Sequence, residues 1–130
     1  MKLLMVSVGR GRYAVAADAL ARIADTTSGS EARRVGSERA VTVHGVSYPV
    51  VDLHGMLGET PSRSCVYLVL EGKDGRAVLP VDKAEEIHDI PATAIAPLPS
   101  FIFAGARRLF RGLFSDGHES RLLLDASVLL

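Results

Sequence analysis

The chain has no tryptophan, few other aromatic residues, one cysteine and no long apolar run. Because Cys65 has no second cysteine to pair with, an internal disulfide is excluded and a reducing cytosol is expected. The apolar start MKLLMVSV stops after about six apolar residues, which is too short for the core of a signal peptide. No other stretch approaches the ~20 apolar residues that span a bilayer. We therefore expect a cytoplasmic protein without membrane insertion.

An excess of charge of one sign is also lacking, since fifteen basic residues balance fifteen acidic ones. No overall field attracts the chain to nucleic acid or to a membrane surface. Basic residues cluster at Arg107, Arg108 and Arg111, where interleaved phenylalanines could contact RNA. A strand with Leu109 and Leu113 inside and the arginines outside explains this pattern better. Nucleic acid is therefore not expected as a partner.

Short apolar runs separated by glycine-containing turns dominate the 130 residues, of which 48% are hydrophobic. This pattern predicts one domain with an all-β fold, either a barrel or a sandwich. Gly75 follows Asp74 and Gly117 follows Asp116, an order typical of hairpin turns. The expected strand pairs are residues 3–8 with 13–16, 41–44 with 47–53, 65–70 with 76–81, and 111–114 with 121–124.

Helical signals are brief. Residues 18–23 and 82–88 each begin with an aspartate that can cap a helix, and one or two turns are expected in each. Residues 25–39 are polar and predict a surface loop. Residues 91–99 contain three prolines, so an extended connector is expected there.

Two stretches of the chain echo one another. PVVDLHGMLG (49–58) and RLLLDASVLL (121–130) each contain an apolar strand, an aspartate and a short segment rich in leucine. Asp52 and Asp125 stand where strand passes to helical turn, which is a natural N-cap position. The echo predicts two similar small β units that pack on one another and leave a groove between them. The expected units are approximately residues 1–59 and 64–130, and an exchange of strands between them is left open.

Reactive side chains are present, but no arrangement of them matches a known chemistry. There is no nucleophile elbow, no cysteine–histidine signature and no phosphate-binding loop, so neither catalysis nor a cofactor is expected. A metal site could use His44, His54 and Cys65, although their spacing matches no known ligand pattern. We expect His54 and His118 to be exposed in turns, and His44 to be a strand residue that faces the groove.

Four motifs, in order, extend over nearly the whole chain. They are LLMVSVGRGRYAVAADALARI (3–23), TVHGVSYPVVDL (42–53), LPVDKAEEI (79–87) and LLDASVLL (123–130). In these four motifs and their order, the chain resembles the CheW-like domain, the adaptor that couples chemoreceptors to the histidine kinase CheA in bacterial chemosensory arrays. The resemblance implies a single CheW-like domain over residues 1–130, built from two small SH3-like five-stranded β-barrels with short helical turns.

The resemblance also implies a function without catalysis. Members bind a receptor tip in the groove between the barrels and contact the regulatory domain of CheA, and such repeated interfaces can close into rings or arrays. The candidates for the receptor groove are Leu20, Arg22, His44, Gly45, Val46 and Pro49. The candidates for the kinase interface are Glu85, Glu86, Arg107 and Arg108. The two glutamates, with Asp89, are most simply a solvated helix face.

Two positions depart from the family pattern. Members usually carry arginine where this chain has His44, and often glutamate where it has Arg22. Imidazole does not reproduce the bidentate fork of arginine, and Arg22 replaces an acid by a base. We therefore expect a divergent adaptor that binds a nonstandard receptor or none. As an alternative, the same fold serves a non-receptor partner in polar localisation or motility.

Overall fold

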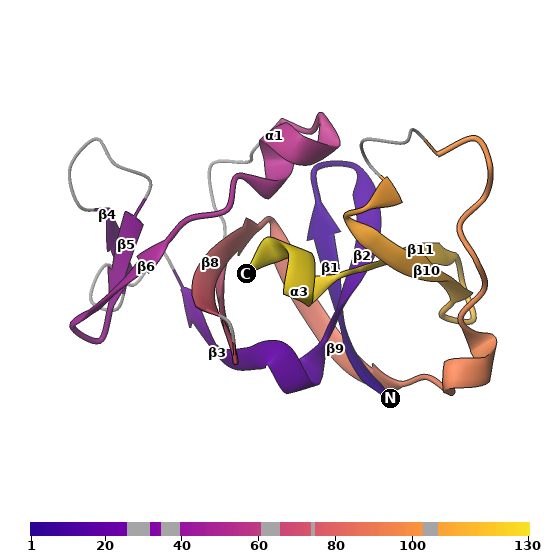
Figure 1. The fold of residues 1–130 in the computed structure, drawn as a ribbon, viewed down its shortest axis with the longest axis horizontal. Helices are drawn as coiled ribbons and strands as arrows, with labels where there is room; N and C mark the ends of the chain where they lie inside the picture. Colours follow the sequence, from indigo (N-terminus) through magenta and orange to yellow (C-terminus); the bar gives the residue numbers. More distant parts are fainter. Residues whose placement is uncertain (26–31, 35–39, 61–65, 74, 103–106) are drawn as a thin grey trace.

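A computed structural model describes residues 1–25, 32–34, 40–60, 66–73, 75–102 and 107–130 (Figure 1). Its strands are β1 (Lys2–Val8), β2 (Gly11–Ala16), β3 (Leu20–Asp25), β4 (Ala32–Arg34), β5 (Ala40–Val43), β6 (Val46–Pro49), β7 (Val66–Gly72), β8 (Gly75–Val81), β9 (Lys83–Asp89), β10 (Phe110–Ser115) and β11 (Ser120–Leu124). Its helical turns are η1 (Ala17–Ala19), α1 (Leu53–Leu57), η3 (Ala92–Ala94) and α3 (Ala126–Leu129). The fold is all-β, as the sequence predicted.

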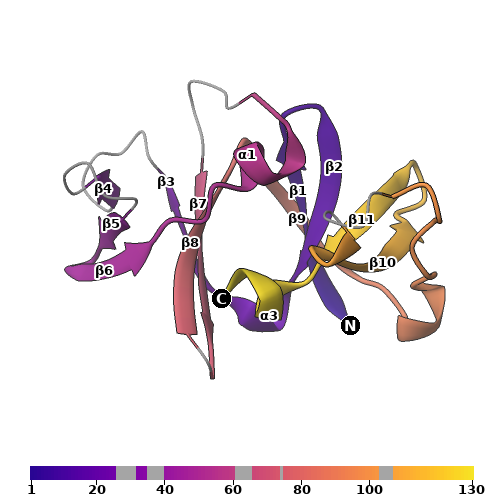
Figure 2. The ribbon, with the colours of Figure 1, turned by 45° about the horizontal axis from the view of Figure 1, so that its top comes forward.

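The strands form three sheets. A five-stranded sheet has the order β10-β11-β2-β1-β9, and two three-stranded sheets have the orders β3-β7-β8 and β4-β5-β6. All pairings among the described strands are antiparallel except that of β11 with β2, where Leu122 lies opposite Tyr13. Figures 1 and 2 show the β4-β5-β6 sheet at one end of the molecule and the β10–β11 hairpin at the other. Strands from both halves of the chain therefore share one sheet, and separate units at residues 1–59 and 64–130 stay a prediction.

Strand β1 is buried on both faces, which explains its continuous apolar sequence. Alternate residues of a strand point to opposite faces of the sheet. Leu4 and Val6 belong to the larger core, which also contains residues of β7 and β8. Leu3 and Met5 belong to a second core, which contains Phe114 of β10. Strand β1 thus separates and supports two hydrophobic layers.

A third, smaller core joins the two three-stranded sheets. It contains Ala24, Val41, Val43, Tyr48, Val69 and Val78. The chain passes from one sheet to the other after β6, where Val50 bridges to Val78 and the Val51 amide donates to the Val78 carbonyl at 2.9 Å. Because of this crossing, β6 ends at Pro49 rather than at Leu53 as expected.

All four expected hairpins are present. Gly117, which has a φ of +95°, lies in the turn between β10 and β11. Gly75 begins β8 and pairs with Gly72, while Asp74 lies outside the described residues. The connector at residues 91–99 is largely extended, with the single turn η3 and a bridge between Ala96 and Leu113.

The two helix predictions are wrong. Residues 18–23 form the end of η1 and most of β3, and residues 82–88 form most of β9. Strand β9 pairs with β1, with Lys83 opposite Ser7 and Asp89 opposite Lys2. The backbone of β1 needs a partner on this side, and that long-range pairing overrides a local helical preference. In the expected loop at 25–39, β4 is a strand that pairs with β5; residues 26–31 and 35–39 lie outside the described ranges.

Candidate functional site

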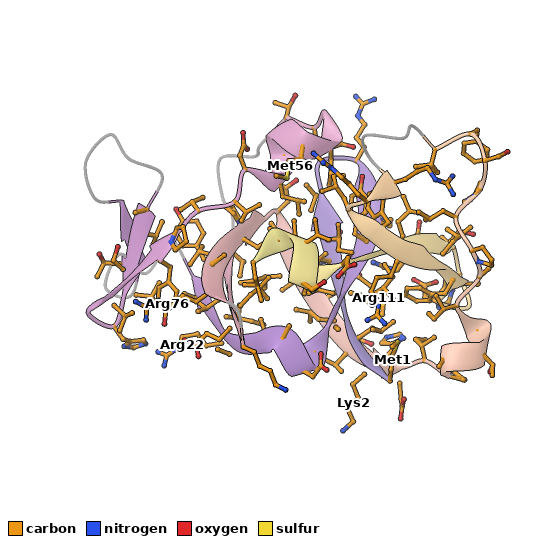
Figure 3. The ribbon with its side chains drawn as sticks, in the orientation of Figure 1. Met1, Lys2, Arg22, Met56, Arg76 and Arg111 are labelled. Carbon is orange, nitrogen blue, oxygen red and sulfur yellow. The ribbon has the colours of Figure 1, made fainter. Side chains whose placement is uncertain are left out.

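Arg22, Tyr48, Glu71 and Arg76 lie together at the edge of the small core, and we call them the Tyr48 face. Arg22 is opposite Val69 in the β3–β7 pair, and Glu71 is opposite Arg76 in the β7–β8 hairpin. Paired residues share one side of a sheet, so all three charged residues lie on the side that β6 covers. Figure 3 shows Arg22 and Arg76 at the same end of the molecule.

Tyr48 is the centre of this face, and only 5% of its surface is exposed. Its hydroxyl donates to Glu71 Oε1 at 3.1 Å, and the Arg76 guanidinium carbon is 5.3 Å from the centroid of its ring. That second contact is a cation–π interaction. Burial, with the hydrogen bond to Glu71, raises the pKa of Tyr48, while the charges of Arg22 and Arg76 oppose the rise. The phenol therefore stays neutral and ties the two small sheets together.

The six expected receptor-groove residues divide between this face and its surroundings. Arg22 belongs to the face, Leu20 begins β3, and half-buried Val46 packs against the small core. Pro49 is adjacent to Tyr48 in β6 and therefore points to the opposite side.

His44 and Gly45 form the turn between β5 and β6. Their φ values are +48° and +77°, so both residues adopt the left-handed conformation that reverses the chain here. His44 is exposed in this turn and is not a strand residue as predicted.

A buried arginine that the sequence analysis did not single out organises the opposite end of the molecule. Arg121 of β11 is 4% exposed. Its Nε donates to Asp116 Oδ2 at 2.5 Å, its Nη2 to Glu85 Oε2 at 3.3 Å, and its Nη1 to the carbonyls of Tyr13 and Val6 at 3.1 and 3.3 Å. One guanidinium thus joins β11 to β1, β2, β9 and the β10–β11 turn. One signal in the sequence could have found it: Arg121 is two residues before Leu123 in the strand, so both side chains lie on the same side of the sheet, where Leu123 is buried.

Glu85, an expected kinase-contact residue, is part of this network. It lies on a strand and not on a solvated helix face, and its Oε1 accepts from the Ser7 hydroxyl at 2.7 Å. That hydrogen bond, aided by Arg121 and Arg12, lowers the pKa of the Glu85 carboxyl. Donation from Arg121, aided by two backbone amides, holds the pKa of Asp116 well below its ordinary value of 3.8.

These two carboxyls predict a loss of stability in acid. Because their folded-state pKa values lie below the unfolded ones, their contribution is complete above about pH 5 and is lost as the pH falls toward the folded values. We expect the urea midpoint to fall steadily from about pH 5 to about pH 3. Asp116→Asn should flatten this dependence, whereas Asp18→Asn, at an exposed position, should leave it unchanged. An equal slope in both variants would contradict the assignment.

The other expected kinase-contact residues are not gathered at one place. Glu86 is exposed on β9, whereas Arg107 and Arg108 precede β10, and β9 and β10 are the two outer strands of the five-stranded sheet. Arg108 is exposed, and Arg107 Nη1 donates to the Pro99 carbonyl at 2.8 Å.

The prediction of which β10 side chains point inward and which point outward was only partly correct. Arg111 is exposed as expected and Leu109 is buried. Phe110 and Phe114 fill the inward positions of β10, and Leu113 is only half-buried. Phe110 packs in the larger core and Phe114 in the second core, so two phenylalanines, rather than Leu113, anchor this strand.

Both aspartates expected as caps are confirmed in that role. Asp52 Oδ1 accepts from the Gly55 amide at 3.1 Å at the start of α1. Asp125 Oδ1 accepts from the Ser127 amide at 3.1 Å and from its hydroxyl at 2.6 Å at the start of α3. Each carboxylate satisfies an amide that the helix leaves unpaired, which is a structural role.

His54 is buried, so the prediction of an exposed turn residue is wrong. Only 4% of its surface is exposed, and Nε2 donates to Asp82 Oδ1 at 2.9 Å. Asp82 Oδ2 also accepts from the amide of Gly9, and the Glu59 carboxylate accepts from the amide of Arg10 at 3.0 Å. The β1–β2 turn is therefore fastened to the segment after α1 through Glu59, and to α1 itself through Asp82 and His54.

Replacing His54 with alanine is expected to lower the free energy of unfolding by about 1–3 kcal/mol, because Asp82 loses its buried donor. His54→Gln retains a donor and should lose less. Urea unfolding at neutral pH measures both. Equal losses in the two variants would show that packing, and not the hydrogen bond, dominates at this position.

Two further findings concern metals and membranes. Among the residues that the structure describes, no group of three or more histidine, cysteine, aspartate or glutamate side chains could hold a metal ion. His44 and His54 lie in different elements, and Cys65, the third candidate ligand, is outside the described ranges. Within the same ranges no helix is long and apolar enough to cross a bilayer.

Known proteins were compared with the chain and its fold. The family model described as the CheW-like domain matches residues 2–130. A similar solved structure is the scaffolding protein TtCheW from Thermoanaerobacter tengcongensis, with a TM-score of 0.77 and 16% identity over 95% of this chain and 88% of that chain. No curated protein sequence matches significantly. The SH3-like all-β architecture is thus confirmed, and the chain belongs to the CheW-like domain family, whose members are scaffold and adaptor domains of the chemotaxis type.

Proposed function

We propose that this chain is a non-enzymatic adaptor that couples a chemoreceptor tip to the regulatory domain of a CheA-type histidine kinase. The observation that carries the proposal is the match to the CheW-like domain over residues 2–130. In this proposal the chain acts on the cytoplasmic side of receptor arrays. Its work is to hold two partners at fixed positions, so it needs two faces that do not overlap.

The receptor side of the proposal is the edge formed by β3 and the β5–β6 turn. Arg22 on β3 and His44 in the turn are both exposed. Val46 is half-buried and adds apolar surface at the rim, whereas half-buried Leu20 packs against the larger core. Gly45 has open space beside its α carbon, so a partner's backbone can approach closely.

On the kinase side, fewer of the candidate residues can contact a partner than the sequence predicted. Arg108 and Glu86 are exposed and can contact a partner directly. Glu85 is committed to Ser7 and Arg121, so its role is to support β9 rather than to touch the kinase. Arg107 likewise holds the connector through the Pro99 carbonyl.

Calorimetric titration with the regulatory domain of the CheA-type kinase from the same genome tests this function. We expect a saturable complex that Arg108→Glu weakens about tenfold, because a rim charge is reversed. Lys73→Glu, an equal charge change at an exposed position on the β7–β8 hairpin, is the matched control and should bind as the wild type does. A chain that is folded but does not bind the kinase domain contradicts the proposal.

A second candidate function is favoured by Arg22 and His44, where the family usually has glutamate and arginine. In this candidate the same fold serves a non-receptor partner in polar localisation or motility. The double change Arg22→Glu with His44→Arg should give affinity for a conventional receptor tip that the wild type lacks. Tight binding of a conventional tip by the wild type would exclude this candidate.

A further inference from the structure

The Tyr48 face presents two arginines, Arg22 and Arg76, that form no ion pair with any described residue. Both side chains are exposed. Both are close enough to Tyr48 for their charges to act on its phenol, and Arg76 stacks over its ring. A buried tyrosine thus separates two guanidinium groups that are available to a partner.

The acid on this face does not cancel these charges. Glu71 lies opposite Arg76 in the hairpin, but its Oε1 accepts the Tyr48 hydroxyl. The single negative charge of Glu71 offsets only one of the two guanidinium charges, so this face keeps an excess of positive charge. The remaining N–H groups of the arginines point to a ligand that accepts hydrogen bonds and carries negative charge.

The surroundings favour a protein segment over a nucleic acid. Val46 borders the face as half-buried apolar surface, and Gly45 offers bare backbone beside it. The net charge of the whole chain is zero, so no long-range field gathers a polyanion. Carboxylates next to aliphatic side chains fit this combination of charge and apolar contact.

We propose that the Tyr48 face binds an acidic protein segment whose carboxylates pair with Arg22 and Arg76. This inference rests on the proposed function only in taking the face as a partner-binding edge. It names the chemistry of the partner, an exposed row of aspartate or glutamate beside apolar residues. Such rim charges control the choice of partner and the rate of encounter.

A fluorescein-labelled helical peptide with a row of glutamates beside a row of leucines is the probe, and a matched peptide has glutamine at the glutamate positions. Fluorescence anisotropy should show binding of the glutamate peptide only, weakened strongly between about 50 and about 500 mM NaCl. Arg22→Glu and Arg76→Glu should each reduce affinity about tenfold, and the double variant should abolish it. Arg111→Glu, an equal charge change that Figure 3 places away from Arg22 and Arg76, should have no effect.

Three results would overturn the inference: equal binding of both peptides, no binding of either, or an unchanged affinity in the double variant. Binding of a labelled single-stranded RNA through Arg22 and Arg76, without binding of the acidic peptide, would assign the face to nucleic acid instead. Kinase-domain binding by the same variants separates the two proposals. It should survive both arginine changes, and its absence from the wild type would remove the proposed function while the peptide result still stands.

Discussion

Replacing Arg121 with methionine is expected to lower the free energy of unfolding by about 3–5 kcal/mol, because removal of one member of a buried ion pair leaves the other uncompensated. Asp116 would lose its 2.5 Å partner in a site where its side chain is 6% exposed. The carbonyls of Val6 and Tyr13 would lose donors as well. Methionine keeps the apolar volume of the aliphatic part of the arginine side chain. The loss of stability therefore measures the contribution of the guanidinium group.

Urea unfolding of this variant has a matched control in Arg111→Met, at an exposed position of β10, which should lose less than about 0.5 kcal/mol. Adding Asp116→Leu to Arg121→Met should recover part of the loss, because no buried charge is then left unpaired. A loss below about 1 kcal/mol for Arg121→Met alone would show that the network is not a structural support.

Replacing Tyr48 with alanine is expected to cost about 3–5 kcal/mol, the range for removal of a buried aromatic ring. The ring is central to the small core, where it packs with Val41, Val69 and Val78. Its loss should loosen the β4-β5-β6 sheet from β3-β7-β8. Relative to the wild type, amide exchange should therefore accelerate more in β5 and β6 than in β1. The acidic peptide should also bind more weakly, because Arg76 loses the ring beneath it.

Tyr48→Phe keeps the ring and removes the hydroxyl that Glu71 accepts. Its cost should be about 1 kcal/mol, the net value of one hydrogen bond. Its exchange pattern should resemble that of the wild type. A similar loss in the phenylalanine and alanine variants would mean that the hydroxyl, and not the packed ring, joins the sheets.

The sequence predicted the elements whose partners are close along the chain. The β1–β2, β5–β6, β7–β8 and β10–β11 hairpins each join neighbouring runs through a short turn, so local alternation and glycine are sufficient signals. Strand β9 was not predicted because its partner β1 lies at the start of the chain, far from β9 in the sequence. Its segment DKAEEIH has local helical character, and nothing within it reveals the strand that it completes.

The same limit applied to the side chains. Asp52 and Asp125 were predicted correctly because a cap depends on residues two or three positions away. His54 was not, since the aspartate that holds it is 28 residues distant. Arg22 could be named from a family pattern, but Arg76 joined it only when the β7–β8 hairpin placed both beside Tyr48.

Co-sedimentation of three components tests the central claim, that one chain joins two partners through separate faces. The components are this chain, the regulatory domain of its CheA-type kinase and the cytoplasmic tip of a receptor from the same genome. The account predicts one ternary complex in which the kinase domain sediments with the receptor tip only when the chain is present. Arg22→Glu with Arg76→Glu should release the receptor tip alone, and Arg108→Glu the kinase domain alone. Competition of the two partners for the chain, or joint release of both by either change, would contradict it.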